Sequence, residues 1–347
     1  MNEFAQMNID VVFVENTGIR SPRLSDAKRL LKYLSGFNGN TKTTDNERSN
    51  VKVVKPLVLP PTNLIFRFLN RAFFIPRLSN KIRKIVREEK IDVGYVYLPT
   101  ATSLDLLKDL NPRSVVYDCV SNFGGHPSAP VDILDTEERL VKISNLVLTD
   151  SDFLYDKMTK KHRNVNKIHH GVNLRKLSFH SYSSEISYGS ACYFGTINDK
   201  LDFESIYRLA ESGVKVTLIG KKQREVSNGI EYLEPMDWER LMSTLSAYDA
   251  FLIPYKSDEF MKGVIPAKIY ECLYFGKPIL YSGLYLPAPL SRLMYYCEGP
   301  EEYVTTWNGL KSTETRTKIT ERRELARAQS TQKNASTIID WIIHSKV

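Results

Sequence analysis

The chain has 347 residues, of which 42% are hydrophobic and 25% charged, values that are ordinary for a soluble globular protein. This length is sufficient for two domains with their own cores, and the composition excludes disordered, collagen-like and disulfide-stapled classes. The formal charge is +8, but residues 1–90 carry 17 Lys and Arg against 8 Asp and Glu, whereas the remaining residues carry 31 and 32. A negatively charged partner is therefore expected at the first quarter of the chain.

Targeting and redox signals are absent from the sequence. The N-terminus MNEFAQMNID has no apolar segment of a signal peptide, and no apolar stretch approaches the roughly 18 residues of a membrane span. The four cysteines lack metal-site spacing, so we expect them to be reduced and buried in a cytoplasmic protein. They are Cys119, Cys192, Cys272 and Cys297.

Short apolar runs alternate with helical patterns along the first half. Strands are predicted over residues 10–15, 51–58, 93–98, 114–117, 146–149 and 167–170, and helices over residues 25–34 and 66–90, the latter interrupted at Pro76. A polar stretch follows at residues 174–190. We therefore expect a first domain that ends near residue 175.

The alternation resumes in the second half. Strands are predicted over residues 191–194, 215–219, 230–233, 250–254 and 278–281, and helices over residues 202–211, 237–247 and 267–275. This rhythm predicts α/β architecture, with two Rossmann-like, doubly wound domains in tandem. Ligands of such sheets bind beyond the carboxyl ends of the strands, and the cleft between two domains is the default site.

Small or polar residues follow three predicted strands of the second half directly. Each of these positions lies where a strand end approaches a ligand, and a glycine there permits close approach of the backbone. A tight strand-to-loop turn is the alternative interpretation of each position. The positions are Gly195 with Thr196, Gly220 with Lys221, and Tyr255 after Pro254.

The segment IPAKIYECLYFGKPIL, residues 265–280, has the features of an anion-binding helix start. Pro266 suits the first helical position, and the amides of Ala267, Lys268 and the next residue are expected to lack intrahelical partners. Such amides and the helix dipole attract a phosphate, and Lys268 adds a full charge. Glu271 lies one turn further along the same face, where a carboxylate can accept two hydrogen bonds from a ribose diol. A Lys268–Glu271 surface ion pair is the alternative interpretation.

These segments, with YFGTI at 193–197 and VTLIG at 216–220, resemble the donor-binding domain of GT-B glycosyltransferases. The resemblance is to family 4 and to bacterial exopolysaccharide and teichuronic-acid-type enzymes. It implies that Ala267, Lys268 and Glu271 contact the diphosphate and ribose of a nucleotide-sugar, with no metal and no further cofactor. It also implies an acceptor-binding domain over residues 1–175, a donor-binding domain over 176–320, and a C-terminal helix over 321–347 that packs back on the first domain.

Two segments of the first half, VVFVENTGIRSPRLSD at 11–26 and VVYDCVSNFGGHP at 115–127, resemble the acceptor domain of the same enzymes. Asp118 and His126 are the candidate general bases, with a turn role for Asp118 and a solvated loop position for His126 as alternatives. The family often has a second acidic residue at the position of Gly263. It also usually begins with a further strand–helix unit ahead of the strand that matches residues 11–15, and here only residues 2–7 precede that strand. We therefore expect the first domain to lack its first strand–helix unit.

Asp150-Ser151-Asp152 spells a DxD metal motif, but it follows a strand and opens a helix. We therefore interpret it as helix capping and predict no required metal.

The segment Asn63 to Lys90 interleaves aromatic and aliphatic residues with seven cations that precede Lys90: Arg67, Arg71, Arg77, Lys81, Arg83, Lys84 and Arg87. We expect it to lie on an anionic membrane surface, at the inner membrane face. An ordinary helix with a solvated basic face is the main alternative, and nucleic acid is disfavoured because no recognition motif accompanies the charges.

The sequence thus predicts a glycosyltransferase that moves a sugar to a saccharide or lipid-linked acceptor in surface-polysaccharide assembly. A nucleotide-sugar epimerase of the same fold is one alternative. A degenerate, non-catalytic partner of another transferase is the other.

Overall fold

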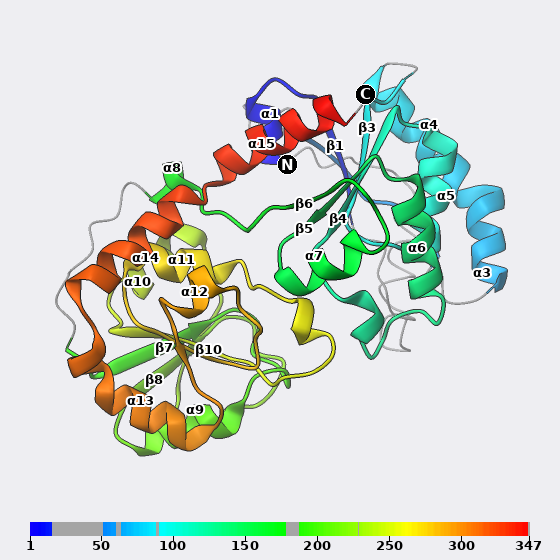
Figure 1. The fold of residues 1–347 in the computed structure, drawn as a ribbon. Helices are drawn as coiled ribbons and strands as arrows, with labels where there is room; N and C mark the ends of the chain where they lie inside the picture. The colour runs from blue at the N-terminus through cyan, green and yellow to red at the C-terminus, as the bar shows by residue number, and fades with distance from the viewer. Residues whose placement is uncertain (16–50, 60–63, 88–89, 178–186, 228, 346–347) are drawn as a thin grey trace. The chain divides into compact units, whose positions relative to one another are not determined.

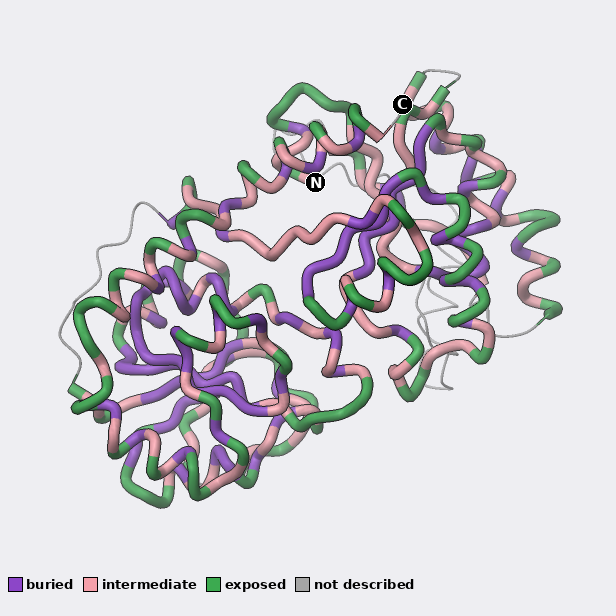
Figure 2. Tube along the Cα trace, viewed as in Figure 1, coloured by how far each residue is buried: buried purple, intermediate pink, exposed green. Residues whose placement is uncertain are grey.

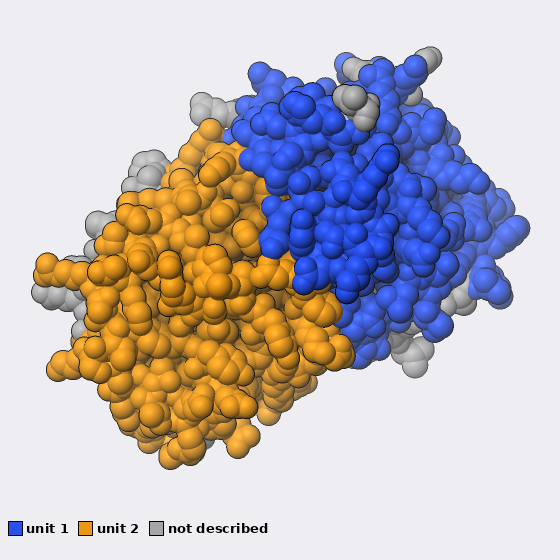
Figure 3. Space-filling view, in the orientation of Figure 1, with its two compact units in different colours: residues 1–149, 154–167, 335–347 blue, residues 150–153, 168–334 orange. Residues whose placement is uncertain are grey.

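The computed structural model describes residues 1–15, 51–59, 64–87, 90–177, 187–227 and 229–345. The chain forms two compact units (Figure 3). Unit 1 comprises residues 1–149, 154–167 and 335–347, and unit 2 comprises residues 150–153 and 168–334. The predicted helix at 25–34 and most of the motif at 11–26 lie outside the described residues.

Unit 1 contains two parallel sheets. Strands β3 (Val93–Val96), β4 (Ser114–Cys119), β5 (Leu146–Thr149) and β6 (Val165–Lys167) pair in that order, and β1 (Val11–Val14) pairs with β2 (Val51–Val54) (Figure 1). The crossovers between β3 and β6 are helices α5 (Ala101–Leu110), α6 (Ile133–Ile143) and α7 (Asp152–Thr159). Helix α4 (Ile75–Val86) packs Leu78 and Ile82 against Val54 of β2.

The predicted strand over 167–170 is wrong beyond Lys167, where β6 ends. The ring Nδ1 of His169 lies 3.0 Å from the carbonyl oxygen of Asp150, and Nε2 of His170 lies 3.1 Å from a carboxylate oxygen of the same residue. Because these two side chains bond to Asp150, this segment leaves the sheet instead of extending the ladder. The predicted interruption at Pro76 also differs from the structure, since Pro76 lies in the first turn of α4 and a π-helical turn, η2 (Asn70–Phe74), precedes it.

Unit 2 is built on one six-stranded parallel sheet with the order β12-β11-β10-β7-β8-β9. Its strands are β7 (Ser190–Phe194), β8 (Lys215–Ile219), β9 (Glu231–Leu233), β10 (Ala250–Pro254), β11 (Ile279–Ser282) and β12 (Tyr295–Tyr296). The strand order reverses between β7 and β10, so their carboxyl ends form the topological switch point at which doubly wound sheets bind ligands.

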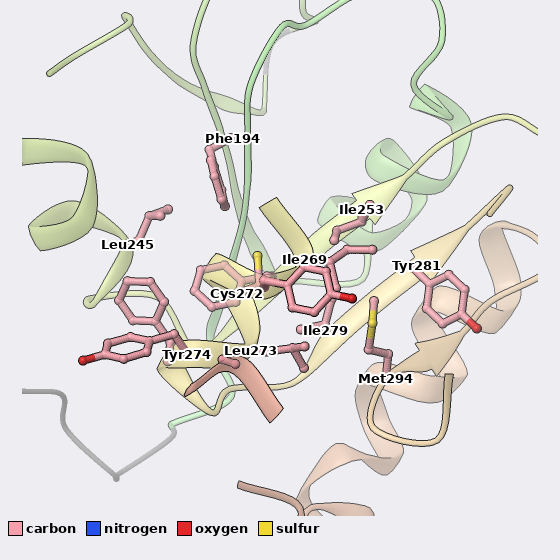
Figure 4. Packing of buried hydrophobic residues seen from close by; sticks show 14 of the residues in the cluster. Phe194, Leu245, Ile253, Ile269, Cys272, Leu273, Tyr274, Ile279, Tyr281 and Met294 are labelled. Atoms are coloured by element: carbon pink, nitrogen blue, oxygen red, sulfur yellow. The ribbon is translucent and has the colours of Figure 1, made fainter. Parts of the chain in front are cut away.

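Both faces of this sheet are covered, which explains why its central strands β7 and β10 are almost entirely buried (Figure 2). Successive residues of β7 alternate between two cores: Cys192 and Phe194 face the core that includes α10 (Trp238–Leu245) and α11 (Lys268–Phe275), whereas Ala191 and Tyr193 face the other. Figure 4 shows the first core, in which Phe194, Leu245, Ile269 and Tyr274 gather. The second core includes α9 (Phe203–Glu211) and α13 (Pro300–Thr313).

Two of the predicted helix starts of unit 2, at residues 202 and 237, are confirmed by side-chain caps. A carboxylate oxygen of Asp202 accepts from the amide of Ser205 at 3.3 Å, and one of Asp237 accepts from the amide of Arg240 at 2.9 Å. All four cysteines are free and buried, as expected. Within the part of the chain that the structure describes, no helix combines the length and apolar composition that crossing a membrane requires.

The C-terminal residues form two helices, α14 (Arg316–Ala328) and α15 (Thr331–His344), where the sequence predicts one over 321–347. Unit 1 receives the chain only from Ala335 onward. Residues 330–331 stay with unit 2 because Val172 donates its amide to Gln329 and accepts from Thr331. The chain therefore passes between the units four times, after residues 149, 153, 167 and 334. The sequence suggests two passages, near residues 175 and 320.

Arg322 of α14 fixes the end of helix α11. Its side chain is fully buried and pairs with Glu314 through two nitrogen–oxygen contacts of 2.6 and 2.7 Å. The same guanidinium donates to the carbonyl oxygens of Leu293 and Gly276, and Gly276 is the residue that ends α11. Four carbonyl and carboxylate oxygens therefore satisfy one buried cation.

We expect Arg322→Met to destabilise the protein by about 3–5 kcal/mol, because the substitution leaves the Glu314 carboxylate buried without its partner. Urea denaturation followed by circular dichroism measures the loss. Arg208→Ala, which removes an exposed pair with Glu301, is the matched control and should leave the midpoint unchanged. An unchanged midpoint for Arg322→Met would contradict the assignment.

Candidate functional site

Two glycine turns lie against each other beyond β7 and β8. Gly195 and Gly220 have φ angles of +134° and +132°, values that residues with a side chain rarely adopt. The Gly195 amide donates to the Ile219 carbonyl oxygen at 2.8 Å, and a Cβ atom at Gly220 would lie 2.2 Å from the Gly195 carbonyl oxygen. At these two glycines the carboxyl edge of the sheet therefore consists of backbone atoms with no side chain over them.

Lys268 reaches from the start of α11 to the end of β7. Its Nζ donates to the carbonyl oxygen of Phe194 at 2.6 Å and lies 4.0 Å from the ring centroid of Tyr193. A Cβ atom at Gly195 would lie 2.5 Å from this Nζ. The absence of a side chain at Gly195 therefore permits the approach, and the switch point carries a cation.

The first turn of α11 offers fewer open amides than the sequence predicts. The Ile269 amide donates to the Pro266 carbonyl oxygen at 3.0 Å, because the helix begins with a tight turn at Pro266. Among the described residues, no group accepts a hydrogen bond from the amides of Ala267 and Lys268. These two amides and the Lys268 ammonium are the donors at this helix start.

Glu271 lies one turn beyond Lys268 and is half-buried. Burial raises the pKa of its carboxyl group, while the Lys268 charge and a hydrogen bond from Trp238 oppose that rise. Because the Lys268 ammonium bonds to Phe194 and the Glu271 carboxylate to Trp238, the two residues are not a simple surface ion pair.

Three further predicted residues line the same edge. Thr196 is exposed and accepts a hydrogen bond on its carbonyl oxygen from the Tyr193 hydroxyl at 3.1 Å. The Tyr255 ring packs edge-on against the Tyr193 ring, with centroids 6.4 Å apart. The carbonyl oxygen of Lys221 accepts a hydrogen bond from the Ile197 amide, and the Lys221 side chain is exposed.

In unit 1, Asp118 lies near the carboxyl end of β4 and is 9% exposed. The Tyr95 hydroxyl of β3 donates to its Oδ2 at 2.7 Å. Burial, followed by the Asp118 charge, raises the pKa of both Tyr95 and Tyr97. The carboxylate is thus oriented by a tyrosine that the sequence reasoning missed; the alternation Tyr95, Tyr97 on one face of a predicted strand was the available signal.

His126, the second candidate base, lies just beyond the short 3-10 turn η3 (Phe123–Gly125). Its ring Nδ1 accepts a hydrogen bond from the Ser128 amide at 3.1 Å. The ring of His126 is thus held by the Ser128 amide, whereas the carboxylate of Asp118 is held by the Tyr95 hydroxyl.

Asp150 and His170 form a polar pair that the sequence did not reveal. The Asp150 side chain is 4% exposed and its carboxylate lies 3.1 Å from Nε2 of His170. Burial raises the pKa of Asp150, while His170 lowers it in part. The capping role predicted for this motif is wrong for Asp150, because α7 begins only at Asp152. Within the described ranges, no three His, Cys, Asp or Glu side chains form a cluster that would hold a metal ion.

We expect Gly220→Ala to destabilise unit 2. The strained backbone conformation alone costs about 1–3 kcal/mol, and the shift that the Cβ atom forces on the Gly195 carbonyl adds to this cost. Gly309→Ala in helix α13 has open space around its Cβ position and should stabilise the protein by about 0.5–1 kcal/mol. Thermal denaturation of both variants tests the turn geometry. Equal melting temperatures would contradict it.

Comparison with known proteins identifies relatives of the fold. No protein-family profile matches the chain. A curated relative, the putative teichuronic acid biosynthesis glycosyltransferase TuaH of Bacillus subtilis, is 22% identical over 252 residues, which are 62% of this chain. The chain spans 63% of the length of that relative.

Solved structures resemble the whole chain more fully. HepE of Anabaena in complex with UDP and glucose superposes with a TM-score of 0.62 at 14% identity, over 96% of this chain and 98% of HepE. The sucrose-phosphate synthase of Thermosynechococcus elongatus superposes with a TM-score of 0.64 at 12% identity, over 95% and 97% of the two chains. Both neighbours are GT-B glycosyltransferases. With its parallel α/β sheets, the chain resembles these enzymes and has the GT-B fold.

Proposed function

We propose that the chain is a glycosyltransferase that moves a sugar from a nucleotide-sugar to a saccharide or lipid-linked saccharide acceptor, in surface-polysaccharide assembly. The likeness to a putative teichuronic acid glycosyltransferase supports the reaction class. The neighbour HepE has been solved with UDP, with UDP and glucose, and with UDP-glucose, which supports a nucleotide-sugar donor.

The observation that carries the proposal is the position of Lys268. Its ammonium and the two open amides of Ala267 and Lys268 lie beside a glycine turn at the switch point of the sheet. Lysine at a helix N-terminus is unfavourable for the helix dipole, so stability alone does not explain it. A bound diphosphate would exchange the Phe194 carbonyl for a phosphate oxygen as the partner of the ammonium.

Transfer of the sugar leaves negative charge on the departing diphosphate. The Lys268 ammonium and the first-turn amides are preorganised donors for that charge, and we propose that they replace a metal ion in this role. Glu271 would accept hydrogen bonds from the ribose hydroxyls. Gly195, Thr196, Gly220, Lys221, Tyr255 and Pro266 would line the path of the donor.

Asp118 is the general base that we propose for the acceptor hydroxyl. The Tyr95 hydrogen bond orients its carboxylate, in the way that a third group orients a catalytic base. His126 remains the alternative base.

The acceptor would be met at an anionic membrane surface through residues 63–90, of which 63 and 88–89 lie outside the described residues. No nucleic acid partner is proposed.

We expect UDP or another nucleoside diphosphate to bind the protein in isothermal titration calorimetry. Lys268→Ala should weaken that binding by roughly tenfold to a hundredfold, because one hydrogen bond to a charged group is lost. Lys311→Ala, at an exposed position of α13, is the matched control and should bind as the parent does. Failure of UDP, GDP, ADP and TDP alike to bind folded protein would refute the transferase and epimerase interpretations together.

With the nucleotide-sugar whose nucleotide binds, Asp118→Asn should lower kcat about 10²–10⁴-fold and leave the Kd for the nucleoside diphosphate unchanged. Tyr95→Phe should give a smaller loss in kcat, because it removes only the orienting hydrogen bond. Release of nucleoside diphosphate in the presence of acceptor is the readout. If His126→Gln abolishes turnover while Asp118→Asn retains it, the base is His126 and the assignment of Asp118 is wrong.

A further inference from the structure

Helix α3 (Leu64–Leu69) exposes three of its apolar side chains. None of its residues is buried, and Leu64, Ile65 and Phe68 are 80%, 71% and 67% exposed. These three lie on one side of the helix, since they occupy positions i, i+1 and i+4. Figure 2 shows the same lack of burial along this helix. A helix of a globular domain normally buries such a face.

Polar side chains hold α3 and the following η2 turn on unit 1. An Nη of Arg67 lies 2.6 Å from the Asp132 carboxylate, and Nε of Arg71 lies 2.8 Å from the Asp105 carboxylate. The buried Asn70 side chain accepts from the Leu59 amide at 2.8 Å and donates to its carbonyl oxygen at 2.7 Å. Two arginines and one amide therefore bond to the unit, whereas the three most exposed apolar side chains of α3 face outward. Its other two apolar residues, Phe66 and Leu69, are partly buried.

This arrangement corrects the expected basic outer face. Two of the seven cations predicted to face a membrane, Arg67 and Arg71, are engaged by carboxylates of unit 1. A third, Arg83, donates to the backbone carbonyl oxygen of Asp109. The outward surface of α3 is apolar where the sequence suggests mixed charge.

Further apolar residues of unit 1 are exposed. Val131 and Leu134 are 106% and 54% exposed and flank Asp132, which binds Arg67 of α3. Phe73 of η2 is 49% exposed. We call these residues together the α3 patch: Leu64, Ile65, Phe68, Phe73, Val131 and Leu134. Clustered exposure of this kind marks an interaction surface, whereas isolated exposed residues do not.

Cations continue from the α3 patch along α4. The Arg77 guanidinium lies 5.9 Å from the Phe73 ring centroid, and Arg77, Lys81 and Lys84 recur at helical spacing on one face. Within the described ranges, no carboxylate pairs with Lys81 or Lys84. An apolar patch is thus bordered by cations that pair with no carboxylate of the described residues.

We propose that the α3 patch inserts into the headgroup region of an anionic lipid surface, with Arg77, Lys81 and Lys84 against the lipid phosphates. Aliphatic and aromatic groups beside lysine and arginine match the chemistry of such an interface. A second copy of the chain on the same patch would bring identical cations together across the interface. Nucleic acid would pair with the cations but not with Leu64 and Ile65. The proposal specifies how the chain would bind the anionic membrane surface named in the proposed function. It rests on that function only for the reason why the protein would bind a membrane.

The test is co-sedimentation of the full chain with vesicles of phosphatidylcholine, alone or mixed with phosphatidylglycerol. We expect binding to the mixed vesicles, at least a tenfold loss for Ile65→Ser/Phe68→Ser, and about a twentyfold or greater loss for Lys81→Glu/Lys84→Glu. Tyr285→Ser, at a 55% exposed aromatic residue of unit 2, is the control and should bind as the parent does. All substituted side chains are at least partly exposed, and circular dichroism melts check that each variant folds.

Equal vesicle binding by the parent and Ile65→Ser/Phe68→Ser would overturn the proposal, as would equal binding to both vesicle types. Sedimentation velocity provides a second readout. If the patch variants change the oligomeric state of the protein and not its vesicle binding, the patch is a contact between copies and the proposal is wrong. Calorimetry with UDP is independent of these results, so failure of lipid binding is distinguishable from failure of the transferase proposal.

Discussion

The approach of the Lys268 ammonium to the end of β7 is the interaction on which the rest of unit 2 depends. The ammonium occupies its position because Gly195, the residue that follows the strand, has no side chain there. Gly220 leaves room for Gly195 in the same way, because its Cβ position is occupied by the Gly195 carbonyl. At its other end, helix α11 is held by the buried Arg322, which bonds to Gly276. The helix is therefore fixed at both ends relative to the sheet.

The same constraint explains how one edge of the sheet serves binding while its faces serve stability. Alternate residues of β7 fill two separate cores, so neither face is open to a ligand. What remains is the carboxyl edge, where the strand order reverses between β7 and β10. Backbone amides, glycine turns and the Lys268 ammonium lie at that edge, while alternate side chains of the strand pack in the two cores.

Much of unit 2 could be predicted from the sequence because its signals are local. Apolar runs of strand length, the capping residues Asp202 and Asp237, and the Pro266–Glu271 spacing each lie within one short segment. The open amides were overestimated, since whether Ile269 bonds to Pro266 depends on the tightness of the first turn. Features formed by distant segments were missed: Tyr95 on Asp118, His170 on Asp150, and Arg67 on Asp132. Arg67 is the clearest case, because a composition pattern cannot reveal which side of an amphipathic helix faces the protein.

The central claim is that the start of α11 and Lys268 hold a nucleoside diphosphate. A crystal structure of the chain grown with UDP tests it most directly. The account predicts diphosphate oxygens within hydrogen-bond distance of the Ala267 and Lys268 amides, with the Lys268 ammonium transferred from the Phe194 carbonyl to a phosphate oxygen. Ordered UDP bound away from this helix, with Lys268 still on Phe194, would contradict it.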